Sequence, residues 1–414
     1  MIKRRFLTTG LTLGLAASGL SVTALTTATV AQAEAIVEGT QFAMSTSGFG
    51  SRLNGGTVPV GSGNSAFEVI ACTNKAGLSR ENHEAEVKVP GLATLSGVKT
   101  EVRTIKTGDM VEARSRHTIA SATLADTSAG VLELRNIVSE SRAFHDAQGF
   151  HGTTTTELGS ITLAGNPIAV PAPGETVTVQ GVAEITLDNS TTSENADGAS
   201  AKADAVRVDL LATGTKLFLA HSRARIDDGI VSGVFTGSSW ASQSQAVDGT
   251  ATTGRTPYQV MPCQGLDGET KNRSITRANL DDAVVARTLT TQHFSQQSAT
   301  VAKGYTQGAV GRVAVNSSEL VIEGVVGRAN VTRTSDGVTS TIRGSTIGEI
   351  RLNGETVRIP RSGVLKIPGV AKLERNVVTR FSNGIFVTAL RLTVLEPNGA
   401  VMNLGNAKLR IRGL

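Results

Sequence analysis

Two histidines that flank a short polar stretch are the residues whose spacing most suggests chemistry in this chain. The stretch reads HDAQGFH over residues 145–151. On a β-hairpin, His145 and His151 could approach each other, and Asp146 could complete a metal site or orient one imidazole as a base. The related segment 333–338 is an ordinary Asp-Gly turn without histidine. A plain turn is therefore the preferred interpretation, and an exported hydrolase that uses His145 and His151 is kept as an alternative hypothesis.

The usual motifs of catalysis and cofactor binding do not occur in the sequence. It contains no Gly-x-Ser-x-Gly elbow, no phosphate-binding loop and no Cys/His zinc spacing. The segments SGVK (96–99) and KTG (106–108) resemble motifs of penicillin-interacting serine enzymes. They lie too close together in a β-patterned region, whereas those enzymes need the serine at a helix N-terminus. We predict no catalytic residue, no cofactor and no metal, and we lean against an enzyme.

The two cysteines, Cys72 and Cys263, permit one disulfide. They occupy equivalent places in two copies of an internal repeat, and equivalent residues meet where two copies are related by a twofold axis. A bridge between the copies is therefore geometrically natural. Two separate buried thiols are the alternative, because a free cysteine packs as a small hydrophobic residue.

Three arginines near one expected hairpin are candidates for contact with an anionic polymer. Residues 328–414 hold 14 Lys and Arg against 5 Asp and Glu. Arg351 and Arg358 alternate with apolar neighbours, so both should face outward, and Arg361 follows closely. Such a basic region could meet an anionic wall polymer or phospholipid headgroups. The alternative is that two oppositely charged domains pack on each other.

An internal repeat must position these residues. Residues 159–174 (GSITLAGNPIAVPAPG) and 348–363 (GEIRLNGETVRIPRSG) align without gaps and share six residues. Each copy is typical of a β-hairpin, with a tight turn at Ala164-Gly165 or Asn353-Gly354. The match continues from AVRVDLL (205–211) to ALRLTVL (389–395), and from HSRARI (221–226) to NAKLRI (406–411). Duplication is the economical explanation.

Apolar residues recur at alternate positions throughout the rest of the chain, with glycine-rich turns between them. This pattern predicts an all-β protein of two tandem, duplicated β-sandwich-like or open-barrel domains, 34–229 and 230–414, with very little helix. Residues 279–289 are the best helical candidate. The polar stretches 187–204 and 232–254 are expected to be solvated connections.

The N-terminus predicts export. Residues 1–33 combine a basic start, an apolar stretch and a small-residue site at Ala31-Gln32-Ala33, as signal peptides do. Arg4-Arg5 leaves both the Sec and the twin-arginine routes open. Cleavage also removes three basic residues from a chain of net charge +5. The high pI is then weak evidence for nucleic acid, and we expect no such partner.

The Ala-Cys-Thr element at 71–73 and the paired strands 205–211 and 389–395, each followed by a turn and a strand, resemble the choice-of-anchor P family. The resemblance covers most of the chain after residue 33, once per copy. It implies an exported, β-rich protein associated with the cell surface, and it implies no site residues. The C-terminal sequence NAKLRIRGL has neither a Leu-Pro-x-Thr-Gly motif nor an apolar helix. We therefore expect no transmembrane anchor and only noncovalent surface association, if any.

These observations favour a non-catalytic, secreted or envelope-associated β-protein with a structural, adhesive or ligand-display role. The second hypothesis is a module that binds an anionic cell-wall polymer through its Arg-rich C-terminal domain. Another surface protein is an alternative partner.

Overall fold

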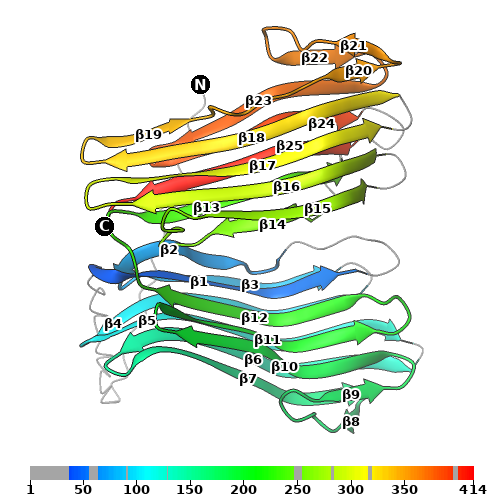
Figure 1. The fold of residues 1–414 in the computed structure, drawn as a ribbon. Helices are drawn as coiled ribbons and strands as arrows, with labels where there is room; N and C mark the ends of the chain where they lie inside the picture. The colour runs from blue at the N-terminus through cyan, green and yellow to red at the C-terminus, as the bar shows by residue number, and fades with distance from the viewer. Residues whose placement is uncertain are drawn as a thin grey trace, which may run out of the picture. The chain divides into compact units, whose positions relative to one another are not determined.

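The alternation of apolar and polar residues produces long antiparallel strands. The computed structural model describes residues 37–55, 64–89, 92–127, 129–246, 254–280, 284–315, 319–394 and 400–414, so the expected signal peptide at 1–33 lies outside the described residues. The described part contains 25 strands and no helix. All of its strand pairs are antiparallel, and the predicted all-β class is confirmed (Figure 1).

Residues 37–227, which we call the first half, form two six-stranded sheets. In order across sheet A, the strands are β2 (Glu68–Ala76), β1 (Glu38–Asn54), β12 (Lys216–Asp227), β11 (Gly198–Leu210), β10 (Ala183–Asn195) and β9 (Thr176–Val179). In order across sheet B, they are β3 (Ser79–Val89), β4 (Ala93–Thr107), β5 (Met110–Thr127), β6 (Gly130–Asp146), β7 (Gly149–Leu163) and β8 (Asn166–Ile168).

Residues 234–414, the second half, form two further sheets. Sheet C contains β14 (Thr256–Met261), β13 (Val234–Ala246), β25 (Ala400–Arg412), β24 (Gly384–Val394), β23 (Ala371–Phe381) and β22 (Val364–Ile367). Sheet D contains β15 (Thr270–Leu280), β16 (Val284–Gln297), β17 (Ala302–Val315), β18 (Leu320–Thr334), β20 (Ile350–Leu352) and β21 (Glu355–Val357), and β19 (Gly337–Thr341) also pairs with β18.

The two halves have the same strand order. Sheet C follows sheet A strand for strand, and sheet D follows sheet B, except that β19 and β20 together take the place of β7. The break between β12 and β13 falls at residues 228–233, where the sequence predicts the domain boundary. Common topology does not establish ancestry, so the duplication itself stays a prediction.

The two repeated hairpins have the predicted geometry. Ile161 pairs with Ile168 across the turn at Ala164-Gly165, and Ile350 pairs with Val357 across the turn at Asn353-Gly354. Both residues of each turn have positive φ, between 48° and 82°. These are the angles of a two-residue hairpin turn, which Asn-Gly adopts readily.

Three local predictions are wrong. The helical candidate 279–289 contains the end of β15 and the start of β16, with residues 281–283 outside the described part. The expected loop 187–204 belongs to β10 and β11, which pair closely up to a turn at Ala196-Asp197. The expected connection 232–254 is largely β13, and its residues 247–253 lie outside the described part. In each case strand pairing with neighbours distant in sequence outweighs the local polar composition.

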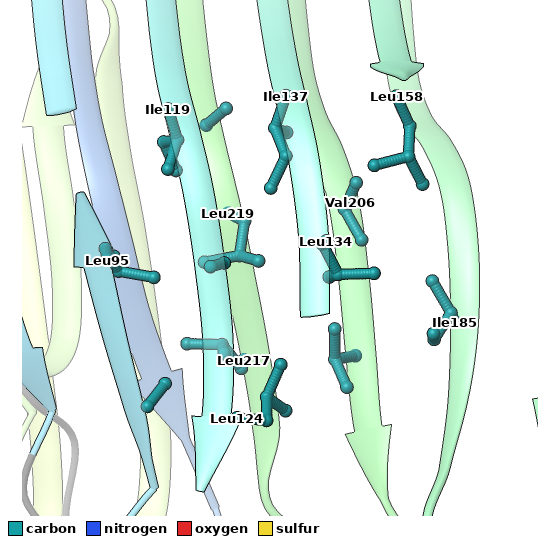
Figure 2. Close-up of a cluster of buried hydrophobic side chains, with 14 of the residues drawn as sticks. Leu95, Ile119, Leu124, Leu134, Ile137, Leu158, Ile185, Val206, Leu217 and Leu219 are labelled. Atoms are coloured by element: carbon teal, nitrogen blue, oxygen red, sulfur yellow. The ribbon is translucent and has the colours of Figure 1, made fainter. Parts of the chain in front are cut away.

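Within each half the two sheets pack face to face and enclose apolar side chains. Figure 2 shows part of the core of the first half, where Leu95, Ile119 and Ile137 of sheet B meet Leu217 and Leu219 of sheet A. Both halves are therefore β-sandwiches. The interior consists mainly of Val, Ile, Leu and Ala, as the low aromatic content of 3% requires.

Each sandwich has two apolar clusters rather than one. Between the clusters lie buried hydroxyl groups and glycines. Ser141 donates a hydrogen bond to the carbonyl of Ser222 on the opposite sheet, at 3.1 Å. In the second half, Gly327 of sheet D lies against the backbone of Gly405 in sheet C, where a Cβ atom would have no room. The sheets therefore approach most closely between the clusters.

A row of residues across the middle of each sheet interrupts the pairing, and we call it the crease. In sheet D the pairs Leu289–Val310 and Arg287–Arg312 enclose an unpaired position on each strand. Every second strand has a residue of positive φ there, for example Thr288 and Gly324 in sheet D. Sheets A, B and C have the same arrangement, at Asp188 and Ala220, at Gly97 and Asn136, and at Asn376 and Gly405.

A disulfide joins the two halves. The predicted bridge between Cys72 and Cys263 is present, with the Cα atoms 5.3 Å apart and a sequence separation of 191. Ala43, Ile230 and Val234 pack around it. Residues 36–414 form one compact unit by their internal contacts.

Candidate functional site

A group of four cations that form no ion pair with any described residue lies on the outer face of sheet C. Lys408, Arg410 and Arg412 alternate along β25, and their neighbours Leu409 and Ile411 point into the core. Arg255, just before β14, lies beside Lys408 and lowers its pKa by repulsion. We call these four cations the basic face. Arg255 and Arg412 are exposed, whereas Lys408 and Arg410 are half-buried.

Aromatic rings lie beneath three of these cations. The Phe381 ring centroid is 5.6 Å from Lys408 Nζ and 4.7 Å from Arg410 Cζ. The Arg255 guanidinium lies over Trp240, 4.4 Å from its centroid. Arg410 also donates a hydrogen bond from Nε to Asn383 Oδ1 at 2.7 Å. Cation–π contact and this hydrogen bond hold the side chains in place and leave most of their donors free.

No carboxylate within the described ranges forms an ion pair with these four cations. Burial lowers the pKa of Lys408, and repulsion from Arg410 and Arg255 lowers it further. Burial and the charge of Arg412 likewise lower the pKa of Arg410. The basic face therefore holds like charges close together in a partly desolvated place, and a bound anion would relieve their repulsion.

The corresponding face of sheet A carries compensated charge. The register places Arg223, Arg225 and Asp227 of β12 at the positions that Lys408, Arg410 and Arg412 have in β25. Arg225 donates two hydrogen bonds to Asp227, at 2.6 and 2.8 Å. This ion pair raises the pKa of Arg225, in the opposite direction to that of Arg410. The residue at this end of the row, Asp227 in one half and Arg412 in the other, thus determines whether the neighbouring arginine is paired with an acid.

The three arginines predicted from the sequence lie elsewhere. Arg351 is in β20 and forms an ion pair with Glu349, which neutralises it. Arg358 and Arg361 follow β21, and both are exposed. The structure therefore does not gather all three into one unpaired cluster. The sequence analysis did not identify the row of cations on β25, although basic and apolar residues alternate in NAKLRIR.

The two histidines of the predicted alternative site do not meet. His145 pairs with Phe150 across the β6–β7 hairpin, and His151 pairs with Phe144, so the two imidazoles are on opposite faces of the hairpin. His145 packs against Phe42 and Phe150, with centroids 4.6 Å away in both cases. His151 Nε2 lies 3.3 Å from Asp146. Among the described residues, no group of three His, Cys, Asp or Glu side chains is placed to hold a metal.

A buried acid–base pair that the sequence analysis did not single out lies at the crease of sheet A. His221 Nδ1 donates to Asp204 Oδ1 at 2.7 Å, and the imidazole stacks on Phe49 with centroids 4.3 Å apart. Burial lowers the pKa of His221 despite the carboxylate, whereas the hydrogen bond from His221 lowers that of Asp204 despite its burial. The equivalent positions in sheet C are Asn406 and Thr388, which also hydrogen-bond each other. A polar pair kept in both halves while its chemistry changes indicates a structural role.

Comparisons with known proteins do not extend this description. No protein-family model matches the chain, and a search of curated proteins finds no match. The resemblance to the choice-of-anchor P family therefore stays a prediction. Within the part of the chain that the structure describes, no helix is long and apolar enough to span a membrane.

Proposed function

We propose that this chain is an exported, non-catalytic β-protein that binds an anionic polymer of the cell envelope through the basic face of sheet C. The observation that carries the proposal is the contrast between the two halves. In the row on β12, Asp227 pairs with Arg225 and offsets one of the two arginine charges, whereas Arg412 leaves the row on β25 without an acid.

The physical argument for an anionic ligand rests on desolvation and repulsion. Burial and other cations lower the pKa of both Lys408 and Arg410. A bound anion would remove this repulsion, and the gain would be larger than at a fully solvated site because screening by water is weaker there. Arg255 and Arg412 are exposed at the two ends of the row, where a ligand can reach them.

Export is the second part of the proposal. The signal-like segment 1–33 is typical of exported proteins. A disulfide such as Cys72–Cys263 persists in an oxidising compartment, so it is compatible with this location. A flat sheet face suits an extended polymer better than a small substrate, which usually needs a concave pocket. We therefore favour adhesion over catalysis.

The test compares two charge reversals of equal size. We expect Arg412→Asp to weaken binding of the oxidised chain to dextran sulfate by at least about tenfold, because the new carboxylate can pair with Arg410 as Asp227 pairs with Arg225. Arg358→Asp, on the hairpin predicted from the sequence, is the matched control and should change the affinity much less. Binding should also fall steeply with added salt.

The contrary results are equally clear. If Arg358→Asp weakens binding more than Arg412→Asp, the hairpin is the anion site and the basic face is not. If neither substitution matters, or if dextran sulfate does not bind at low salt, the proposed function is wrong. Circular dichroism of both variants checks that the fold is retained.

A further inference from the structure

The spacing of the cations on β25 carries information about the repeat of the ligand. Lys408, Arg410 and Arg412 are separated by two residues each, and an antiparallel strand rises about 3.4 Å per residue. Their backbone origins therefore recur at about 6.8 Å. β25 pairs with β13 on one side and with β24 on the other, so the strand is held straight beneath the first two cations.

The row is also one-dimensional. Arg255 acts on Lys408 at one end, and Arg412 acts on Arg410 at the other. Phe381 lies beneath the two central cations and restricts their movement across the sheet. Lys408, Arg410 and Arg412 thus form a line along β25, and Arg255 lies to one side, over Trp240 of β13. A chain-like ligand can follow the line of three.

We propose that the basic face recognises a linear phosphodiester polymer with roughly six backbone bonds between phosphates, which lies along β25. This inference rests on the proposed function and specifies its ligand. Two residues of the strand also contain about six backbone bonds, so an extended polymer of that repeat presents its charges at the interval of the cations. Three of the four cations are arginines, whose planar fork matches the oxygens of phosphate groups.

The rings of this face argue for a polymer without bases. Single-stranded nucleic acids have a similar charge repeat, but the proteins that hold them stack bases on open aromatic faces. Trp240 is only 5% exposed and is covered by Arg255. Phe381 lies beneath two cations. A polyol phosphate such as poly(glycerol phosphate) therefore fits the face better than a nucleic acid does.

The test compares three ligands with the same number of phosphates on the full oxidised chain. The ligands are poly(glycerol phosphate), oligothymidylate and inorganic polyphosphate, in which the charges are closer together. We expect poly(glycerol phosphate) to bind at least as tightly as oligothymidylate and several-fold more tightly than polyphosphate. A ligand that contacts four cations should give a slope of about −3 for log K against log salt. Arg412→Asp removes one cation and pairs with Arg410, so it should reduce the magnitude of the slope by about 1.5.

Each binding result that differs from this expectation excludes a defined part of the proposal. If polyphosphate binds as tightly as poly(glycerol phosphate) while Arg412→Asp still weakens both, the face binds polyanions without regard to spacing, and only the further inference fails. If oligothymidylate binds clearly more tightly than poly(glycerol phosphate), bases contribute and the inference is wrong. If none of the three binds, the proposed function fails as well. Arg358→Asp should leave all three affinities nearly unchanged.

Discussion

At the residue scale, two buried histidines should make the stability of the fold sensitive to acid. His117 and His293 are both 0% exposed. His117 Nδ1 donates to Thr100 Oγ1 at 2.6 Å, because that hydroxyl itself donates to the carbonyl of Ala66. Its Nε2 has no partner among the described residues. A second proton on this ring would be a buried, unpaired charge, which is costly.

Burial lowers the pKa of His117 from 6.5 to about 3, with a smaller contribution from the charge of His221. Burial also lowers the pKa of His293 from 6.5 to about 4. Below pH 6.5 the unfolded chain therefore binds two protons that the folded chain does not bind. These two residues stabilise the fold fully above pH 6.5, and their contribution is lost as the pH falls towards 4.

Between about pH 6 and 4, the two histidines together should lower the free energy of unfolding by about 2.7 kcal/mol per pH unit. We expect His293→Gln to halve this contribution, since Gln cannot take up the proton. Urea denaturation at several pH values measures the slope. The exposed His83 provides the control, because His83→Gln should leave the slope unchanged. An unchanged slope in His293→Gln would show that His293 is protonated in the folded state.

Gly327 illustrates how one missing side chain sets the distance between two sheets. A Cβ atom at this position would overlap the carbonyl oxygen of Gly405. Gly327 is paired with Gly308, and Gly405 lies within β25 between two neighbouring strands, so neither backbone can move aside easily. We therefore expect Gly327→Ala to destabilise the fold by at least about 4 kcal/mol or to prevent folding. Gly254 has nothing within 4 Å of its would-be Cβ. Gly254→Ala should therefore be nearly neutral in thermal denaturation, and equal Tm values for the two variants would contradict the close packing.

At the scale of elements, the crease explains why some strands are difficult to predict from the sequence. The buried residues of β16 are Val284, Ala286, Leu289, Thr291, His293 and Ser295. The strand alternates with period two on both sides of the crease, but the step from Ala286 to Leu289 is three residues because Thr288 has positive φ. A three-residue step between apolar positions imitates a helix, and for this reason residues 279–289 resemble one.

The same reasoning separates the predictable elements from the unpredictable ones. The hairpins at 159–174 and 348–363 have regular alternation and glycine-containing turns, so the sequence predicts them. β11 is different, because its inward-facing residues include Ala199, Ala201 and Ala203, which carry a weak hydrophobic signal. In the basic face, Arg255 lies over Trp240 and beside Lys408, which follows it by more than 150 positions. No local sequence pattern predicts that Arg255 and Lys408 are neighbours.

The crease also makes a prediction for a single strand. Thr288 is an exposed, β-branched residue with φ of +53°, a conformation that such residues adopt only under strain. We expect Thr288→Gly to stabilise the fold by about 0.5–1 kcal/mol. Thr276 occupies the crease on the neighbouring strand β15, is exposed and has no positive φ, so Thr276→Gly should destabilise the fold instead. Chemical denaturation of both variants compares them, and equal effects would mean that Thr288 is not strained.

At the scale of the whole molecule, two similar sandwiches differ mainly in their charge. The first half offsets one arginine of its outer row with Asp227, and the second half leaves all three charges of its row positive. The sequence alignment of HSRARI with NAKLRI ends one residue before this exchange. A division of labour follows if the proposal holds, in which the first half supports the structure and the second half binds the ligand.

The Cys72–Cys263 bridge has a mechanical consequence for a protein that holds on to a polymer. When the chain is pulled from its two ends, tension passes from Cys72 directly to Cys263 through the sulfur atoms. The loop between them, which contains β3 to β14, carries no load. Roughly 650 Å of chain is therefore withheld from extension until the bridge is reduced. Single-molecule stretching with and without dithiothreitol should show this difference in contour length, and the oxidised protein would act as a short, stiff tether.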